Sequence, residues 1–306
     1  MANLSPESKA YLEAFNQMPA MHEMDPQSVR NMMAEAPVPE LELEPVAKVE
    51  DKLIPGYQGE EIKVRIYTPE GEGPFPVFVY YHGGGWVLGD IEISDPSCRV
   101  LANKTKHVVV SVDYRLSPEY KFPVPVEDAY AALTWVKENA SSLNVSDSNI
   151  VVGGDSAGGN LAAALTHMTR DRKGPEISAQ VLIYPVTDLS YDTGSYKEFA
   201  VGFGLDRKLM IWFGDHYVNN QADTQNVYAA PLRADKLDGL PPAFVITCEN
   251  DVLRDEGKAY ADKLSQSGVP TEYFCQEGIV HGYFTNMAVF PNQIHSAIEK
   301  VSNFLR

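Results

Sequence analysis

The chain has 306 residues, of which 44% are hydrophobic, and its 25 basic and 42 acidic side chains give a formal net charge of −17. This length suits one large domain, or one domain with a small subdomain, and is enough to bury a continuous core. The acidic balance disfavours nucleic acid and anionic membranes as partners. The three cysteines, Cys98, Cys248 and Cys275, match no zinc-binding spacing and are too few for a disulfide framework, so no metal site is expected.

The first residues contain no basic start followed by an apolar run, so we expect no signal peptide. The longest apolar run, 77–81, is far shorter than the roughly 20 residues that span a bilayer. Together with the sparse cysteines, these features predict a cytoplasmic protein without stable membrane association.

Two short helices are predicted near the start of the chain. Ser5 and Pro6 begin the first, and Asp25 and Pro26 begin the second, because each pair supplies an N-cap and a first-turn proline. Five of the nine methionines follow closely, at positions 18, 21, 24, 32 and 33. Since methionine fills irregular apolar gaps, this segment either packs on the core or lines an adaptable apolar pocket, for which Met32 is a candidate.

From about residue 60 the sequence alternates between strands and helices. Residues 62–67 alternate apolar and polar side chains, as an antiparallel strand with one buried face does. Short apolar runs, typical of a buried parallel sheet, lie at 77–81, 108–112, 150–152, 180–184, 243–247 and 271–275. Helical patterns lie at about 96–104, 124–140, 157–170, 255–267 and 292–305. The alternation predicts an α/β doubly wound sheet that binds ligands at the carboxyl ends of its strands.

One stretch, residues 188–230, interrupts this alternation. It contains a helical pattern over 206–218, with apolar side chains on one side. We predict that residues 1–45 and 188–230 form a helical cap, over a core made of residues 46–187 and 231–306. Phe203 and Leu205, within the insertion, are candidate ligand contacts.

The motif Gly154-Asp155-Ser156-Ala157-Gly158 follows one buried strand and opens a helix. This is the strand–turn–helix context of a nucleophile elbow, in which Ser156 is exposed at the sheet edge and bulky neighbours would clash. The similar GDSGG motif of trypsin-like proteases occurs in all-β proteins, and here the flanking segments are a strand and a helix. Ser156 is therefore the candidate nucleophile.

The segment from His82 to Trp86, with three glycines between them, directly follows the strand at 77–81. Glycines let backbone N–H groups approach a developing oxyanion closely. We expect Gly83, Gly84 and Ala157 to supply these donors, and we expect His82 to fix the loop by a hydrogen bond. Trp86 and Asp155 are weaker candidates for contacts with a substrate.

Among seven histidines, His281 follows the last predicted strand by a short loop, 276–280, which places it at a carboxyl strand end. A neutral imidazole there can take the proton of a serine hydroxyl. Asp251 follows the strand at 243–247 and is the candidate that orients the imidazole, with Glu249 as its main competitor. We interpret Asp255 and Glu256 as charges at a helix N-terminus.

Taken together, these motifs resemble the hormone-sensitive-lipase-like esterases, bacterial family IV, from about residue 60 to 306. The matching segments are HGGGW at 82–86, DYRLSPE at 113–119, FPVPVEDAYAAL at 122–133, GDSAGGNLA at 154–162, DVLRDEG at 251–257 and HGY at 281–283. The resemblance implies an α/β-hydrolase fold with a helical cap, hydrolysis of short-to-medium acyl esters, no cofactor, and frequent homodimers. It maps the triad onto Ser156, Asp251 and His281.

The sequence departs from the family pattern at Val252, where proline commonly follows the acid, so the rigidity of that turn is in doubt. Arg115 and Glu119 are predicted to pair beneath the site, and Asp155 either binds the His82 loop or acts on the water of deacylation. An amidase, a thioesterase or a lactonase shares the same chemistry, because the pocket decides the substrate. A ligand receptor of this fold is the alternative from another class, although such receptors lose a triad member.

Overall fold

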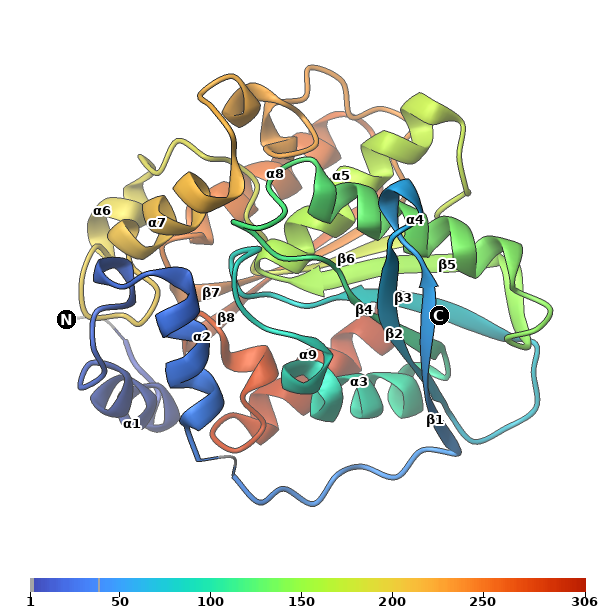
Figure 1. Ribbon diagram of the computed structural model, residues 1–306, viewed down its shortest axis with the longest axis horizontal. Helices are drawn as coiled ribbons and strands as arrows, with labels where there is room; N and C mark the ends of the chain where they lie inside the picture. The colour runs from blue at the N-terminus through green and yellow to red at the C-terminus, as the bar shows by residue number, and fades with distance from the viewer. Residues whose placement is uncertain (1–2, 38) are drawn as a thin grey trace.

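The computed structural model describes residues 3–37 and 39–306. Eight strands form one sheet in the order β1-β2-β4-β3-β5-β6-β7-β8, and helices cover both faces (Figure 1). β1 pairs antiparallel with β2, and β2 with β4, whereas the remaining pairs are parallel. The strands are β1 (Lys48–Pro55), β2 (Glu61–Thr68), β3 (Phe75–Tyr81), β4 (Val108–Asp113), β5 (Val145–Asp155), β6 (Ala179–Ile183), β7 (Ala243–Asn250) and β8 (Thr271–Val280). The predicted fold class, a mostly parallel doubly wound sheet, is confirmed.

The parallel strands are buried on both faces, which explains why their sequences are nearly all apolar. Along β3, Val77 and Val79 pack into one hydrophobic cluster, while Phe78 and Tyr80 pack into another. The helices that flank the sheet are α3 (Ile91–Thr105), α4 (Val124–Glu138), α5 (Ala157–Arg172), α8 (Arg254–Gln266) and α9 (Pro291–Phe304).

Four further helices gather at one end of the sheet, at the left of Figure 1. We call them the outer helices: α1 (Pro6–Phe15), α2 (Pro26–Glu35), α6 (Gly194–Glu198) and α7 (Arg207–Tyr217). Ser5 and Asp25 cap α1 and α2 with their side chains, as the sequence predicted. The indole N–H of Trp212 in α7 donates to the carbonyl of Met24 at 3.1 Å, which joins segments nearly 200 residues apart in the chain.

Several boundaries differ from the sequence-based expectation. The edge strand β1 was not predicted, because most of its side chains are exposed and leave no apolar alternation. Helix α3 begins at Ile91, where Asp90 caps it, and Pro96 lies inside the helix instead of starting it. β8 continues to Val280, past an irregular register, so the expected loop at 276–280 is part of the strand.

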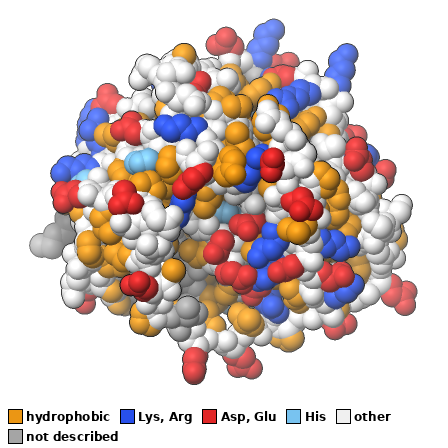
Figure 2. Space-filling model, viewed as in Figure 1, with side chains coloured by type: hydrophobic (Ala, Val, Ile, Leu, Met, Phe, Trp, Pro, Cys, Tyr) orange, Lys and Arg blue, Asp and Glu red, His pale blue; other side chains and the backbone are white. Residues whose placement is uncertain are grey.

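Short 3₁₀ turns complete the connections, at Met21–Glu23, Tyr57–Gly59, Asp223–Gln225, Pro231–Arg233 and Tyr283–Thr285. Within the described residues, no helix is long and apolar enough to cross a membrane. Acidic and basic side chains are intermixed across the face that Figure 2 shows, with hydrophobic side chains between them.

Candidate active site

Ser156 lies in the sharp turn between β5 and α5, with φ 55° and ψ −118°. A non-glycine residue in this region is strained by about 1–3 kcal/mol, and the turn persists because its surroundings hold it. A Cβ atom at Gly154 or Gly158 would lie 2.2 or 1.9 Å from the carbonyl oxygen of Tyr81. Only glycine at these two positions therefore allows β3 to pack against the turn.

The structure brings Ser156, His281 and Asp251 together, although they lie far apart in the sequence. The Nε2 atom of His281 is 2.9 Å from the Oγ atom of Ser156, and Nδ1 is 2.7 Å from Oδ2 of Asp251. The Asp251 side chain is fully buried, and its Oδ1 accepts a hydrogen bond from the N–H of Leu253 at 2.9 Å. This is the geometry of a hydroxyl, a base and an orienting acid.

Of the two acids considered, only Asp251 contacts His281. Glu249 accepts a hydrogen bond from the N–H of Gly278 at 2.6 Å and lies outside the relay. Asp255 and Glu256 lie in the first turn of α8, which confirms their predicted place at a helix N-terminus. Glu256 is 1% exposed, and its Oε1 accepts from the N–H groups of Thr187 and Asp188, which fixes the chain just after β6.

In the glycine loop after β3, the backbone N–H groups that are free to bind an oxyanion are not all the ones predicted from the sequence. The N–H of Gly83 donates to Oδ1 of Asp155 at 2.9 Å, so this group is already engaged. Among the described residues, no acceptor lies against the N–H of Gly84 or Gly85, or against that of Ala157 at the first position of α5. The free donors near the serine are thus those of Gly84, Gly85 and Ala157, because the first N–H groups of a helix lack partners within it.

The carboxylate of Asp155 holds the glycine loop by hydrogen bonding. Its carboxylate accepts from the hydroxyl of Tyr80 at 2.7 Å as well as from Gly83, and Tyr184 lies at 3.4 Å. Burial raises the pKa of Asp155, and the hydroxyl of Tyr80, the nearby His281 and the N–H of Gly83 oppose this rise. The side chain also borders the cavity beside Ser156.

His82 behaves as the sequence suggested. Its Nδ1 atom is 2.7 Å from the carbonyl oxygen of Gly83, and its ring stacks on Tyr114 at 4.4 Å. Burial lowers the pKa of His82 to about 4, so the ring is neutral at physiological pH. Trp86 is fully buried and stacks on Tyr217 at 4.1 Å, behind the glycine loop and outside the cavity wall.

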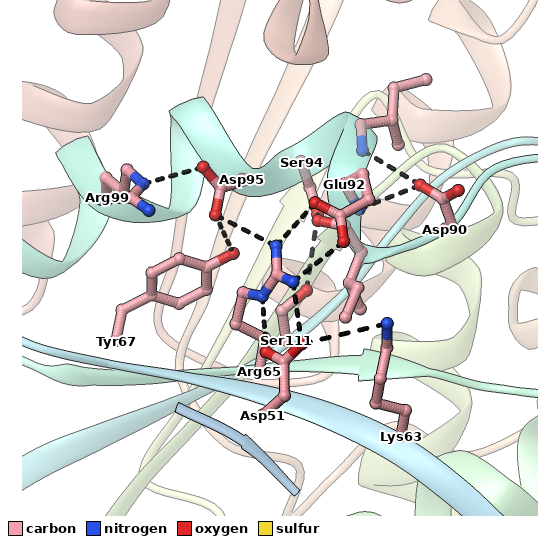
Figure 3. Close-up of polar contacts among 12 residues, drawn as sticks. Asp51, Lys63, Arg65, Tyr67, Asp90, Glu92, Ser94, Asp95, Arg99 and Ser111 are labelled. Atoms are coloured by element: carbon pink, nitrogen blue, oxygen red, sulfur yellow. Dashed lines mark hydrogen bonds and ion pairs between the residues drawn. The ribbon is translucent and has the colours of Figure 1, made fainter. Parts of the chain in front are cut away.

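An ionic network ties the edge of the sheet to the helix that follows the glycine loop (Figure 3). Arg65 in β2 donates to Asp51 in β1 at 2.6 and 2.8 Å, and to Glu92 in α3 at 2.7 and 2.9 Å. Asp95, also in α3, accepts from the hydroxyl of Tyr67 at 2.9 Å. These contacts hold the first turn of α3, and with it the end of the loop.

A second set of contacts joins the outer helix α2 to the same loop. Arg30 donates to the carbonyl of Val87 at 2.9 Å, to that of Ser117 at 2.6 Å, and to both carboxylate oxygens of Glu119. The predicted pair of Arg115 with Glu119 is therefore wrong. Arg115 binds Asp128 of α4 instead, because a fully buried carboxylate needs a cationic partner.

A cavity opens above Ser156 and holds about 820 Å³ of empty space, part of which is open to solvent. Leu205 and Asp155 border it, whereas Met32 and Phe203 lie outside its wall. Its apolar wall comes mainly from residues that the sequence did not single out as contacts: Tyr11, Phe15, Leu88, Leu209, Met210 and Phe213. Of these, Leu209, Met210 and Phe213 belong to the apolar side of the predicted helix at 206–218. That apolar side was the feature of the sequence that could have identified them. Among the described residues, no cluster of His, Cys, Asp and Glu could hold a metal ion.

Comparison with known proteins gives consistent matches. A family model described as alpha/beta hydrolase fold matches residues 78–285. The chain is 42% identical over 256 residues to carboxylesterase NlhH of Mycobacterium tuberculosis, covering 82% of this chain and 80% of that protein. It is 40% identical over 258 residues to an arylesterase of Saccharolobus solfataricus, covering 84% and 82%.

Solved structures agree over nearly the whole chain. A hyperthermophilic esterase of Pyrobaculum calidifontis superposes with a TM-score of 0.90 at 42% identity, covering 100% of this chain and 98% of that one. A thermostable esterase of Pseudomonas putida gives a TM-score of 0.92 at 34% identity, covering 100% and 99%.

Proposed function

The chain belongs to the alpha/beta hydrolase family and is a serine carboxylic-ester hydrolase, and we propose that Ser156, His281 and Asp251 are its catalytic residues. The observation that carries this proposal is the continuous relay of 2.9 and 2.7 Å contacts from hydroxyl to imidazole to carboxylate. His281 takes the proton of Ser156 as the hydroxyl attacks the ester carbonyl, and returns it to the leaving alcohol. Asp251 stabilises the imidazolium that forms between these steps.

The acyl group is then carried by the oxygen of Ser156 until water releases it. His281 takes a proton from this water, the water oxygen attacks the acyl carbonyl, and the Ser156 oxygen recovers its proton as the acid leaves. Each attack produces an oxyanion. We propose that the N–H groups of Gly84, Gly85 and Ala157 bind it, because no acceptor lies against these donors within residues 3–37 and 39–306.

We further propose that residues 1–45 and 188–230 act as a cap that shapes the pocket for an ester with a short-to-medium acyl chain. The cavity wall supports this proposal, since Tyr11, Phe15 and Leu209 come from these segments and offer no charge to a substrate. We also propose that the chain forms a homodimer and is cytoplasmic, which light scattering and cell fractionation would test.

The experiment that tests the function compares the wild-type chain with Ser156→Ala on p-nitrophenyl butyrate. We expect kcat to fall by about 10⁶-fold, the scale for a triad serine. A fluorophosphonate should label the wild-type chain on Ser156 and leave the variant unlabelled. Unchanged turnover in the variant, or labelling at another residue, would overturn the assignment.

A further inference from the structure

A second depression adjoins the catalytic cavity among the outer helices. Its two walls are the segment 15–22, which leaves α1, and the segment 201–206, which leads into α7, and Leu209 also lines it. It holds about 750 Å³ of empty space, part of which is open to solvent. We call it the outer groove. The side-chain amide of Asn16 donates to the carbonyl of Gly202 at 3.3 Å and so joins the two walls.

The outer groove and the catalytic cavity share part of their walls. Phe15, Met21 and Leu209 border both spaces. Met21 lies in a single 3₁₀ turn, and its unbranched side chain has three rotatable bonds and adapts easily to a neighbour. A thin ligand that fills the catalytic cavity can therefore continue into the outer groove when this side chain changes rotamer.

The chemistry of the outer groove is mostly apolar. Val201 is 75% exposed and Met18 is 43% exposed, and both belong to its walls. Covering such side chains with an apolar ligand is favourable, because it removes apolar surface from water. The carboxylate of Asp206 is already engaged, because it caps α7 by accepting from the N–H of Leu209 at 2.8 Å.

We propose that the outer groove binds the far end of an unbranched aliphatic chain of the ester substrate, once that chain has filled the catalytic cavity. The proposal rests on the proposed ester hydrolysis at Ser156 and extends it to substrates with longer chains. The chain belongs either to the acyl group or to the alcohol, since both are aliphatic in such esters. Phe15, Met21 and Leu209 form the passage between the two compartments.

This arrangement predicts a particular dependence of kcat/KM on chain length. Each methylene group that becomes buried in the outer groove should raise kcat/KM by up to about fourfold. Esters whose chains are longer than the catalytic cavity can hold should therefore be hydrolysed with a kcat/KM that rises with chain length. They should not be excluded by the outer helices.

The experiment fills the outer groove without touching the catalytic cavity. Ala20 borders the groove alone, is exposed, and begins a 3₁₀ turn. Ala222 is also exposed and begins a 3₁₀ turn, but lies outside both spaces, so Ala222→Trp is the matched control for Ala20→Trp. Two substrate series are measured: p-nitrophenyl esters from acetate to decanoate, and alkyl acetates from ethyl to decyl.

We expect Ala20→Trp to lower kcat/KM for the longest members of one series by about tenfold or more, with the acetate unchanged. The affected series identifies the chain that the groove binds, and Ala222→Trp should match the wild type throughout. Equal profiles for Ala20→Trp and the wild type in both series would overturn the proposal, as would a loss that is equal for short and long esters. Failure of the wild type to hydrolyse p-nitrophenyl acetate would instead overturn the proposed function itself.

Discussion

The reacting groups and the cavity wall that faces them are held in different ways. Ser156 and His281 directly follow strands of one sheet, and Asp251 occupies the turn after a third. The opposing wall comes from α1, α2 and α7, which lie outside the sheet. They are held by apolar packing of side chains such as Leu12, Val29 and Phe213, and by side-chain bonds such as those of Arg30. Substitutions near the strand ends should therefore change the chemical step, whereas substitutions in the outer helices should change binding.

The largest effect apart from loss of the nucleophile is expected at the orienting acid. Asp251→Asn keeps the shape of the side chain but no longer fixes the tautomer of His281, so kcat should fall by about 10⁴-fold. Glu249→Gln is the matched control, because Glu249 has no contact with the relay, and we expect nearly wild-type kcat. Steady-state kinetics at one pH distinguish the two variants, and similar losses in both would contradict the assignment.

The next effect concerns the glycine loop. Gly84 has φ 104°, and a Cβ atom there would lie 2.1 Å from the carbonyl oxygen of Leu88. Gly84→Ala must move the loop and displace an oxyanion donor, so kcat should fall by about 10²–10³-fold with little change in KM.

Gly268→Ala provides the control for backbone strain alone. Gly268 has φ 81°, and a Cβ atom there would meet nothing within 4 Å. Its variant should lose stability in urea denaturation and keep kcat. If both variants retain wild-type kcat, the loop does not supply the donor that we assign to it.

A smaller effect is expected where α2 meets the sheet layer. Arg30→Met removes the bonds to Val87, Ser117 and Glu119, so α2 and its cavity-lining Met33 should become mobile. We expect KM for p-nitrophenyl butyrate to rise by about tenfold, with kcat within about twofold.

Arg172→Met is the matched control, because Arg172 also binds a glutamate with both guanidinium N–H groups, at 2.8 and 2.7 Å, but lies at the far end of α5. It should lower the free energy of unfolding and leave KM unchanged. An equal rise of KM in both variants would mean that Arg30 acts through general stability.

The same contrast explains which parts of the fold and of the active site could be predicted from the sequence. The buried strands and the order of the reacting residues were predictable, because apolar runs and a serine between glycines are local patterns. The identity of the oxyanion donors was not. Whether Gly83 or Gly85 has a free N–H depends on Asp155, which approaches from a different strand.

The cavity wall was harder to predict for a similar reason. Helical periodicity indicates which side of a helix is apolar, but not whether that side meets the core or a cavity. Met32 and Met33 are adjacent in α2, and only Met33 borders the cavity. The partner of Glu119 was also unpredictable, since Arg30 lies 89 residues away in the sequence.

The smallest effect concerns stability and arises at the end of β4. Burial raises the pKa of Asp113 to about 6; Lys63 opposes this rise, while Asp90 and Glu92 add to it. An unfolded chain loses the proton near pH 3.8, so in the window from there to about pH 6 only the folded chain keeps it. The folded state therefore loses stability as pH rises through this window, and the loss is complete above it.

Asp113→Asn removes this loss, so the variant should be more stable than the wild type at about pH 8. At about pH 4.5 this gain in stability should be smaller. The gain at the higher pH should be about 1 kcal/mol, since solvent screens a half-buried group. Asp51 is an internal control of opposite sign, because the hydrogen bonds from Arg65 lower its pKa. Asp51→Asn should cost nearly the same stability at both pH values, because the stabilising effect of a lowered pKa is lost only below about pH 3.8. Urea denaturation at both pH values compares the two variants. A gain for Asp113→Asn that is independent of pH would mean that the Asp113 carboxylate is ionised in both the folded and the unfolded chain. The destabilising effect of Asp113 would then arise from packing.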